Sequence, residues 1–259
     1  MTFTSAEAMA WIGAFFWPFM RIGAMVMLAP VFSDQQVSAR IRLLFAVALT
    51  VGVMPVSGLG PEVEPLSAEW FLICLQQVLI GMCMGLLIAL ALQTASIAGE
   101  SIALSMGLGF ANMVDPVTGQ STPVVSQFLI VLVTLLFLVM GVHLMLIELM
   151  AESFRVMPVG TEGLVQEDLR TVAEWGVHMY AGAVLIALPA VVLLLLVYLS
   201  LGVMTRAAPQ MNIFSVGFPV TMLVGYIAIM TIIIPSLPGR MSGIWSHAFQ
   251  TIGTIIGTN

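Results

Sequence analysis

Lysine is absent from this chain of 259 residues, and charged side chains of either sign are scarce. The seven basic residues are all arginines and are outnumbered by thirteen acidic residues, which gives a formal net charge of −6. This balance excludes the basic surface that binds nucleic acids and the polybasic clusters that hold proteins to anionic lipid. Charged residues make up 8% of the chain and hydrophobic residues 60%, which leaves too little polar surface for a globule in water. We therefore expect a membrane-associated protein whose apolar surface faces lipid or other apolar subunits.

Cysteine and histidine are also rare. Cys74 and Cys83 lie in one apolar segment, where nine residues of helix would separate them by roughly 13 Å, too far for a disulfide. His143, His178 and His247 are scattered, and none has the spacing of a metal motif such as HExxH. The sequence also lacks a GxSxG nucleophile elbow and a phosphate-binding loop. It predicts no metal site, no cofactor and no catalytic activity.

Hydrophobic residues gather in six segments that are typical of helices. They cover roughly residues 9–32, 43–56, 71–98, 128–149, 177–204 and 214–234. A helix needs about 20 apolar residues to cross hydrocarbon, so the second segment is short and the third is long. Pro18, Pro189 and Pro219 fall inside the first, fifth and sixth segments and predict kinks or breaks. The expected fold is all-α and membrane-associated, with several kinked or broken helices.

Arginine placement does not orient these segments. Six alternating spans would divide the six arginines outside the segments equally, with Arg40, Arg42 and Arg206 on one side and Arg155, Arg170 and Arg240 on the other. The positive-inside rule therefore predicts no orientation, and this argues against six ordinary spans. Tryptophans at segment edges, Trp11, Trp70, Trp175 and Trp245, fit either an interfacial belt or packing within protein.

Two ladders of small residues predict close helix contacts. Gly81, Gly85 and Ala89 recur every four residues, as do Ala95, Gly99, Ala103 and Gly107. This spacing places small residues on one helix face, where two backbones can approach closely. A different pattern covers residues 161–180, where apolar residues follow one face and charged residues the rest. It predicts an amphipathic helix at a polar boundary, with Arg170 able to pair with Glu174.

A few charges stand in or beside apolar surroundings, namely Arg21, Glu100, Asp115 and Glu148. Such charges usually face a partner or a wet cavity. Arg21 has no acidic residue within helical reach, so we expect its partner to be distant in sequence or on another subunit. Arg21 and Glu100 are candidates for structural ion pairs. The alternative is a proton relay of the kind that a secondary transporter uses.

Residues 105–123 form a loop with a mixed composition. Glycines and prolines stop a helix and permit sharp bends. The loop nevertheless keeps bulky apolar side chains, which could close a pore by excluding water. The candidate plug residues are Met106, Gly107, Leu108, Gly109, Phe110, Met113, Val114, Asp115 and Pro116. A buried re-entrant loop is the alternative interpretation.

The stretch from Arg206 to Pro219 is the most distinctive segment between two apolar helices. It combines a cation, two amides, two aromatic rings and two prolines where a short wet turn would suffice. We interpret it as a rigid bend that fits against other protein, because apolar rings gain little in water; a solvated loop is the alternative. Its proposed interface residues are Arg206, Pro209, Gln210, Asn212, Phe214, Gly217, Phe218 and Pro219.

Three blocks of the chain resemble the FliR family of the flagellar type III export gate and its virulence-secretion relatives. They are the bend just described, residues 21–32 followed by Arg40, and residues 107–119 followed by Pro123 and Gln127. The blocks occur in matching order and span nearly the whole chain. The run from Gln210 to Phe218 resembles the flagellar branch.

The resemblance implies a channel subunit that passes unfolded flagellar proteins and assembles with FliP-type and FliQ-type subunits, with FlhB docking on the assembly and FlhA below it. It implies bent hairpins in a hetero-oligomeric helical assembly at the flagellar basal body in the bacterial inner membrane, raised toward the periplasm. Residues 1–149 would form a FliP-like part, residues 177–259 a FliQ-like hairpin with a tail, and residues 106–122 the plug. A transporter acting alone and a purely structural scaffold remain the competing hypotheses.

Overall fold

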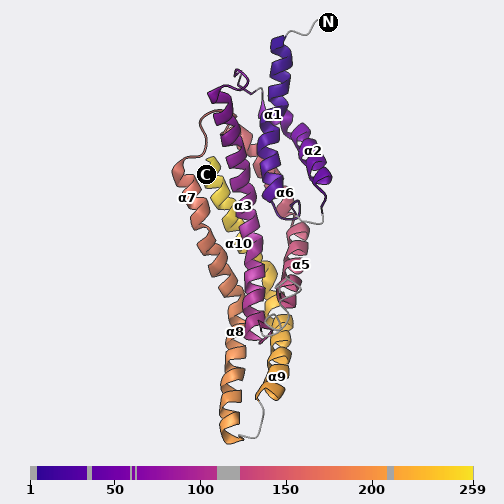
Figure 1. The fold of residues 1–259 in the computed structure, drawn as a ribbon, viewed down its shortest axis with the longest axis vertical. Helices are drawn as coiled ribbons and strands as arrows, with labels where there is room; N and C mark the ends of the chain where they lie inside the picture. Colours follow the sequence, from indigo (N-terminus) through magenta and orange to yellow (C-terminus); the bar gives the residue numbers. More distant parts are fainter. Residues whose placement is uncertain are drawn as a thin grey trace. The chain divides into compact units, whose positions relative to one another are not determined.

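The computed structural model describes residues 5–33, 37–58, 60, 61, 63–109, 123–208 and 213–258. Every regular element in these ranges is helical, which confirms the all-α prediction (Figure 1). The helices are α1 (Ser5–Leu28), α2 (Ala39–Ser57), α3 (Ala68–Ser105), α5 (Val124–Val139), α6 (Val142–Val156), α7 (Gln166–Glu174), α8 (Gly176–Ala207), α9 (Ile213–Ala228), a π-helix (Ile229–Ile233) and α10 (Ile234–Ile256).

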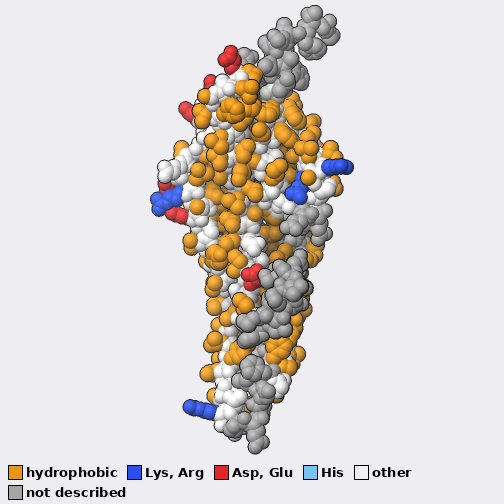
Figure 2. All heavy atoms as spheres, in the orientation of Figure 1, with side chains coloured by type: hydrophobic (Ala, Val, Ile, Leu, Met, Phe, Trp, Pro, Cys, Tyr) orange, Lys and Arg blue, Asp and Glu red, His pale blue; other side chains and the backbone are white. Residues whose placement is uncertain are grey.

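Four of the described helical stretches are long and apolar enough to cross a membrane, and a fifth arises if α5 and α6 count as one bent span. The break between α5 and α6 contains Gly141, which has a positive φ of 70°. Hydrophobic side chains cover most of the face drawn in Figure 2, with few charged side chains among them. These features confirm a membrane helical protein with broken segments.

The sixth apolar segment continues further than its composition indicates. We expected it to end near residue 234, but α9 passes through the π-helix into α10, which ends at Ile256. Arg240, which six alternating spans would place in a terminal loop, therefore lies inside a helix.

The chain folds into two compact units that are interleaved along the sequence. Unit 1 contains residues 1–90, 140–176 and 245–259, and unit 2 contains residues 91–139 and 177–244. The expected division into residues 1–149 and 177–259 describes likeness to other subunits rather than packing, and it stays a prediction.

Unit 1 packs α1 against α2 and against the first part of α3, and α2 also contacts α6. The first small-residue ladder makes the α1–α3 contact possible. A Cβ atom at Gly81 would lie 2.0 Å from the Arg21 carbonyl oxygen, and one at Gly85 would lie 2.8 Å from that of Met25. Both positions therefore require glycine, which confirms the predicted close approach.

Tryptophan in unit 1 serves packing within the protein. Trp175 and Trp245 are each only 2% exposed. Trp70 joins an aromatic cluster, with its ring 5.5 Å from that of Phe16 and 6.0 Å from that of Trp17. Buried rings of this kind do not form an interfacial belt, so packing within protein is the interpretation that holds at these positions.

Unit 2 packs the second part of α3 against α5, and it packs α8 against the start of α10. A Cβ atom at Gly99 would lie 2.5 Å from Ser126 Cα, so the second ladder also marks a close contact. The Ser126 hydroxyl strengthens that contact by donating to the Ser96 carbonyl at 2.9 Å. Gly182 of α8 faces Ile244 and Thr94 at similarly short range.

Candidate functional site

The candidate site lies in unit 2, where α9 passes the C-terminal end of α3. The amide of Gly107 donates to the Leu104 carbonyl at 3.0 Å, and the amide of Leu108 donates to the Ala103 carbonyl at 3.0 Å. With a φ of 85° at Gly107, this pair of bonds forms a Schellman motif, which ends a helix at a residue that favours glycine. The predicted helix stop is therefore present at Gly107.

Met106, the residue before this turn, is seated against α9. Its side chain is completely buried. A Cβ atom at Gly225 would lie only 2.6 Å from Met106 Cγ and 2.7 Å from its sulfur, so glycine leaves a notch that the methionine fills. Thr221, one turn earlier on the same face of α9, donates its hydroxyl to the Met106 carbonyl at 3.1 Å. Met106, the first residue or root of the predicted plug, thus contacts α9 through its side chain and through its backbone carbonyl.

Aromatic groups flank the turn itself. A Cβ atom at Gly107 would lie 3.5 Å from the Phe218 ring and 3.5 Å from the Tyr198 hydroxyl. Phe218 belongs to the predicted bend, so the structure brings one residue of the bend to one residue of the plug. Both rings are partly exposed, at 41% for Phe218 and 44% for Tyr198.

The chain returns to α3 where α5 begins. Pro123 precedes α5, and its carbonyl accepts from the Gln127 amide at 3.1 Å. Ser126, in the first turn of α5, lies against Gly99 of α3. The residues that precede and follow segment 110–122 are therefore both held near the C-terminal end of α3.

Several predicted site residues lie outside the described residues. These are Phe110, Met113, Val114, Asp115 and Pro116 of the plug, and Pro209, Gln210 and Asn212 of the bend. The backbone of Phe214 lies in α9, but its side chain is not described. Arg206 is exposed in the last turn of α8, Gly217 is buried and Pro219 is exposed within α9.

Arg21, in unit 1, is fully buried, and its contacts differ from the ion pair that we expected. Its Nε donates to Gln77 Oε1 at 2.8 Å, Nη1 donates to the Ser153 carbonyl at 3.0 Å and Nη2 donates to the Met157 carbonyl at 2.9 Å. The guanidinium also lies 4.2 Å from the centre of the Phe154 ring. Within the part of the chain that the structure describes, the partners of Arg21 are therefore neutral groups.

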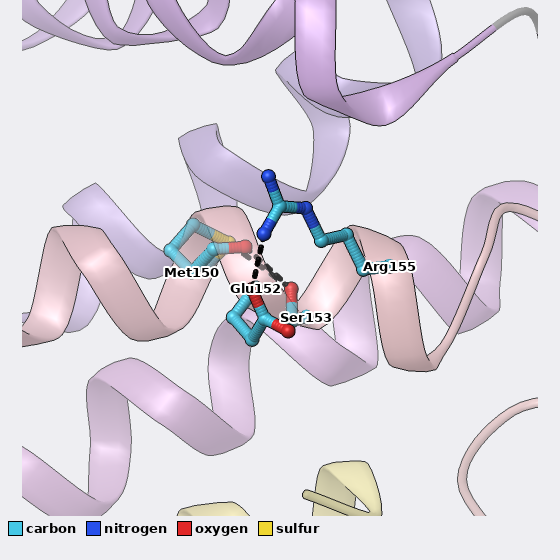
Figure 3. A network of polar contacts seen from close by, with 4 residues as sticks. All are labelled: Met150, Glu152, Ser153 and Arg155. Atoms are coloured by element: carbon cyan, nitrogen blue, oxygen red, sulfur yellow. Dashed lines mark hydrogen bonds and ion pairs between the residues drawn. The ribbon is translucent and has the colours of Figure 1, made fainter.

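These carbonyls belong to the C-terminal end of α6, which carries partial negative charge. Figure 3 shows the same helix, with Ser153 bonded to Met150 and Arg155 paired with Glu152 at 3.1 Å. Arg155 and Glu152 are exposed, so their pair is a surface feature, whereas Ser153 faces the buried Arg21. The predicted pair between Arg170 and Glu174 is likewise present and exposed, at 2.7 Å.

A proton relay has little support in this geometry. Arg21 contacts no titratable group among the described residues, and Glu100 lies partly exposed on α3, in unit 2. In the same residues, no three His, Cys, Asp or Glu side chains gather closely enough to bind a metal ion.

Sequence reasoning missed Thr221, Gly225 and Tyr198. Thr221 and Gly225 are separated by four residues, a spacing that places them on one helix face, but the run Val224-Gly225-Tyr226 has no distinctive composition. Only the packing identifies Gly225 as the seat of Met106.

Comparison with known proteins identifies the family of this chain. The family model described as bacterial export proteins, family 1, matches residues 12–251. The chain is 37% identical over 257 residues to the flagellar biosynthetic protein FliR of Pectobacterium carotovorum subsp. carotovorum, covering 99% of this chain and 97% of that protein. It is 34% identical to the FliR protein of Escherichia coli strain K12, covering 98% and 96%, and 31% identical to that of Bacillus subtilis strain 168, covering 83% of each. The chain therefore belongs to the FliR family of bacterial export proteins.

Proposed function

We propose that this chain is a channel subunit of the flagellar protein export gate and that residues 106–122 plug the channel. Family membership and the apolar helices support a membrane component of the flagellar export apparatus. The plug is supported by one observation in particular. The segment starts at a locked helix end, Met106 and Gly107, and the chain rejoins the same helix at Ser126. Such fixed ends suit a segment that must return to one position after substrate has passed.

The composition of the segment fits this role. It carries bulky apolar side chains among glycines and prolines, and its described beginning supplies a buried methionine. Apolar side chains close a narrow pore by expelling water, and methionine adapts its shape readily. The subunit would then catalyse no reaction. It would line the channel for unfolded flagellar proteins and close it with the plug.

The proposed assembly contains FliP-type and FliQ-type subunits, with FlhB and FlhA as further partners, at the flagellar basal body in the inner membrane. Exposed apolar side chains support an assembly of this kind, because helices α2 and α8 leave most of theirs uncovered in this chain. The bend from Arg206 to Pro219 would contact a neighbouring subunit. Residues 1–149 would occupy a FliP-like place and residues 177–259 a FliQ-like place.

Replacing residues 110–122 by a flexible glycine-serine linker tests the plug. The replacement keeps Met106 and Gly107, so the packed end of α3 is preserved. We expect the gate to assemble and the cell membrane to become permeable to small ions, measured as potassium efflux from cells and as loss of membrane potential. Assembly is checked by co-purification of the partner subunits in mild detergent.

The matched control is the same kind of linker at residues 158–163, between α6 and α7. This loop lies in unit 1 and outside the proposed plug. We expect it to leave ion permeability at the wild-type level. An assembled gate that stays tight after replacement of residues 110–122 would contradict the plug.

A further inference from the structure

The contact between Met106 and α9 depends on the register of α9. Gly225 provides the notch for the Met106 side chain. One turn before it stands Thr221, and one turn after it stands the buried Ile229. Both of these residues are β-branched, so neither leaves space for a methionine. A shift of α9 by one turn, about 5.4 Å, would therefore expel Met106 from its seat.

The backbone contact depends on the same register. The last carbonyls of a helix have no partner within that helix, and the Met106 carbonyl follows directly after α3. The Thr221 hydroxyl lies 3.1 Å from it and 3.0 Å from the Phe218 carbonyl, so the two carbonyls share its single hydrogen. If α9 rotates or slides, this acceptor loses its donor at the same moment as the side chain loses its notch.

The helix that carries this contact contains a break in its hydrogen bonding. Immediately after α9, residues 229–233 form a π-helix, and the Ile234 amide bonds the Ile229 carbonyl, five residues back. Such π-turns are uncommon and occur often at functional sites. Nearer the start of α9, the Phe218 ring flanks Gly107. The part of α9 that contacts Met106 is thus followed directly by a turn with altered hydrogen bonding.

We propose that α9 acts as a latch, which means that it holds Met106, the first residue of the plug, while the channel is closed. Gly225 holds the Met106 side chain, and the Thr221 hydroxyl holds the Met106 carbonyl. This inference rests on the proposed function and adds how the closed state is held. Opening the channel requires α9 to move relative to α3 and to release both contacts together. Met106, Thr221 and Gly225 are positioning residues that act through the plug segment.

Substitutions that change the side-chain volume at Met106 and at Gly225 test the latch. Gly225→Ala places a Cβ atom within 2.6–2.9 Å of three Met106 side-chain atoms and should displace the root of the plug. We expect ion leak from cells with assembled gates to rise about fivefold or more, because overpacking destabilises the seated state. Met106→Ala, which empties the notch, should also raise the leak. The double variant, with alanine at both positions, should leak less than either single variant.

Gly202→Ala is the matched control, because a Cβ atom there, on α8 in the same unit, meets nothing within 4 Å. We expect its leak to equal that of the wild type. Thr221→Val and Thr221→Ser form a second pair, in which only valine removes the hydroxyl donor. Valine should raise the leak and serine should not.

The outcomes separate the latch from the plug. If the 110–122 replacement leaks while Gly225→Ala and Thr221→Val stay tight, the latch is wrong and the plug stands. If none of these variants leaks, the proposed plug itself fails. If the gate with Gly225→Ala does not assemble, the ion leak of Thr221→Val compared with Thr221→Ser decides whether the latch is correct. Failure of Thr221→Val to assemble as well would overturn the latch, because these residues would then serve assembly.

Discussion

Arg21 is a buried cation whose hydrogen-bond partners, among the residues that the structure describes, are all neutral. Burying a charge is costly unless hydrogen bonds and opposite charge compensate for it. Arg21 obtains its compensation from Gln77, from two carbonyls at the end of α6 and from the Phe154 ring. The helix end supplies a partial negative charge without a carboxylate. Arg21 therefore ties α1 to α3 and α6 at one point.

Replacing Arg21 by leucine should destabilise the assembled protein strongly. Leucine leaves the Met157 carbonyl and the Gln77 amide oxygen without the donor that Arg21 supplies, at about 1–3 kcal/mol for each buried group. The Ser153 carbonyl loses one of its two donors and keeps the Met157 amide. Lysine keeps the charge but not the planar fork of donors, so it should restore only part of the loss. Thermal unfolding of the purified complex, monitored by tryptophan fluorescence, measures the difference.

The control for Arg21 is Arg170→Leu, which removes an exposed arginine whose pair with Glu174 is of the kind worth about 0.3–0.5 kcal/mol. Its melting temperature should stay close to that of the wild type. Equal shifts for the two leucine variants would contradict a structural role for the buried cation.

At the scale of the helix, α8 stays continuous through a proline. Pro189 has no amide hydrogen, so the carbonyl four residues earlier, that of Leu185, lacks its helical donor. Arg240 of α10 donates to this carbonyl from Nη1. Both residues belong to unit 2. A cation from a neighbouring helix thus replaces the backbone bond that the proline removes.

This replacement predicts a specific coupling between Arg240 and Pro189. Arg240→Leu alone should reduce stability by about 0.5–1.5 kcal/mol, the net value of a typical hydrogen bond, because the exposed Leu185 carbonyl loses its donor. In a Pro189→Ala background the alanine amide can supply that donor, so the same change at Arg240 should have little effect. Thermal unfolding of the four proteins of this double-mutant cycle gives the coupling free energy. Equal losses in both backgrounds would show that Arg240 acts elsewhere.

The elements that could be predicted from sequence are those with a strong local pattern. Small-residue spacing identified the close contacts at Gly81, Gly85 and Gly99, and glycine after an apolar run identified the end of α3. The helix beyond residue 234 was missed, because Pro235 and Pro238 are typical of an interruption. The π-helix before them shifts the bonding pattern, and the helix continues. No local pattern indicates which residue of α9 receives Met106, because that depends on the register of two helices distant in sequence.

At the scale of the whole molecule, the exposed faces of the helices are mostly apolar but include polar positions. Exposed hydrophobic residues recur along α8, among them Val184, Leu188, Leu195 and Leu199. Lipid would satisfy such residues, but it would not satisfy Gln93, which is exposed on the long apolar helix α3. A polar side chain that faces hydrocarbon is expensive, so positions of this kind favour contact with protein or water.

This surface predicts how the chain behaves with and without partners. Expressed alone and extracted in mild detergent, it should aggregate or be degraded, because the surfaces that the proposed assembly would cover stay exposed. Co-expression with FliP-type and FliQ-type subunits should give one monodisperse complex by size-exclusion chromatography, with its composition read from subunit masses. Gln93→Leu should improve the behaviour of the solitary chain if detergent covers this face, and leave the complex less stable if a polar partner does. A solitary chain that is already monodisperse and stable would contradict assembly as the means by which this surface is covered.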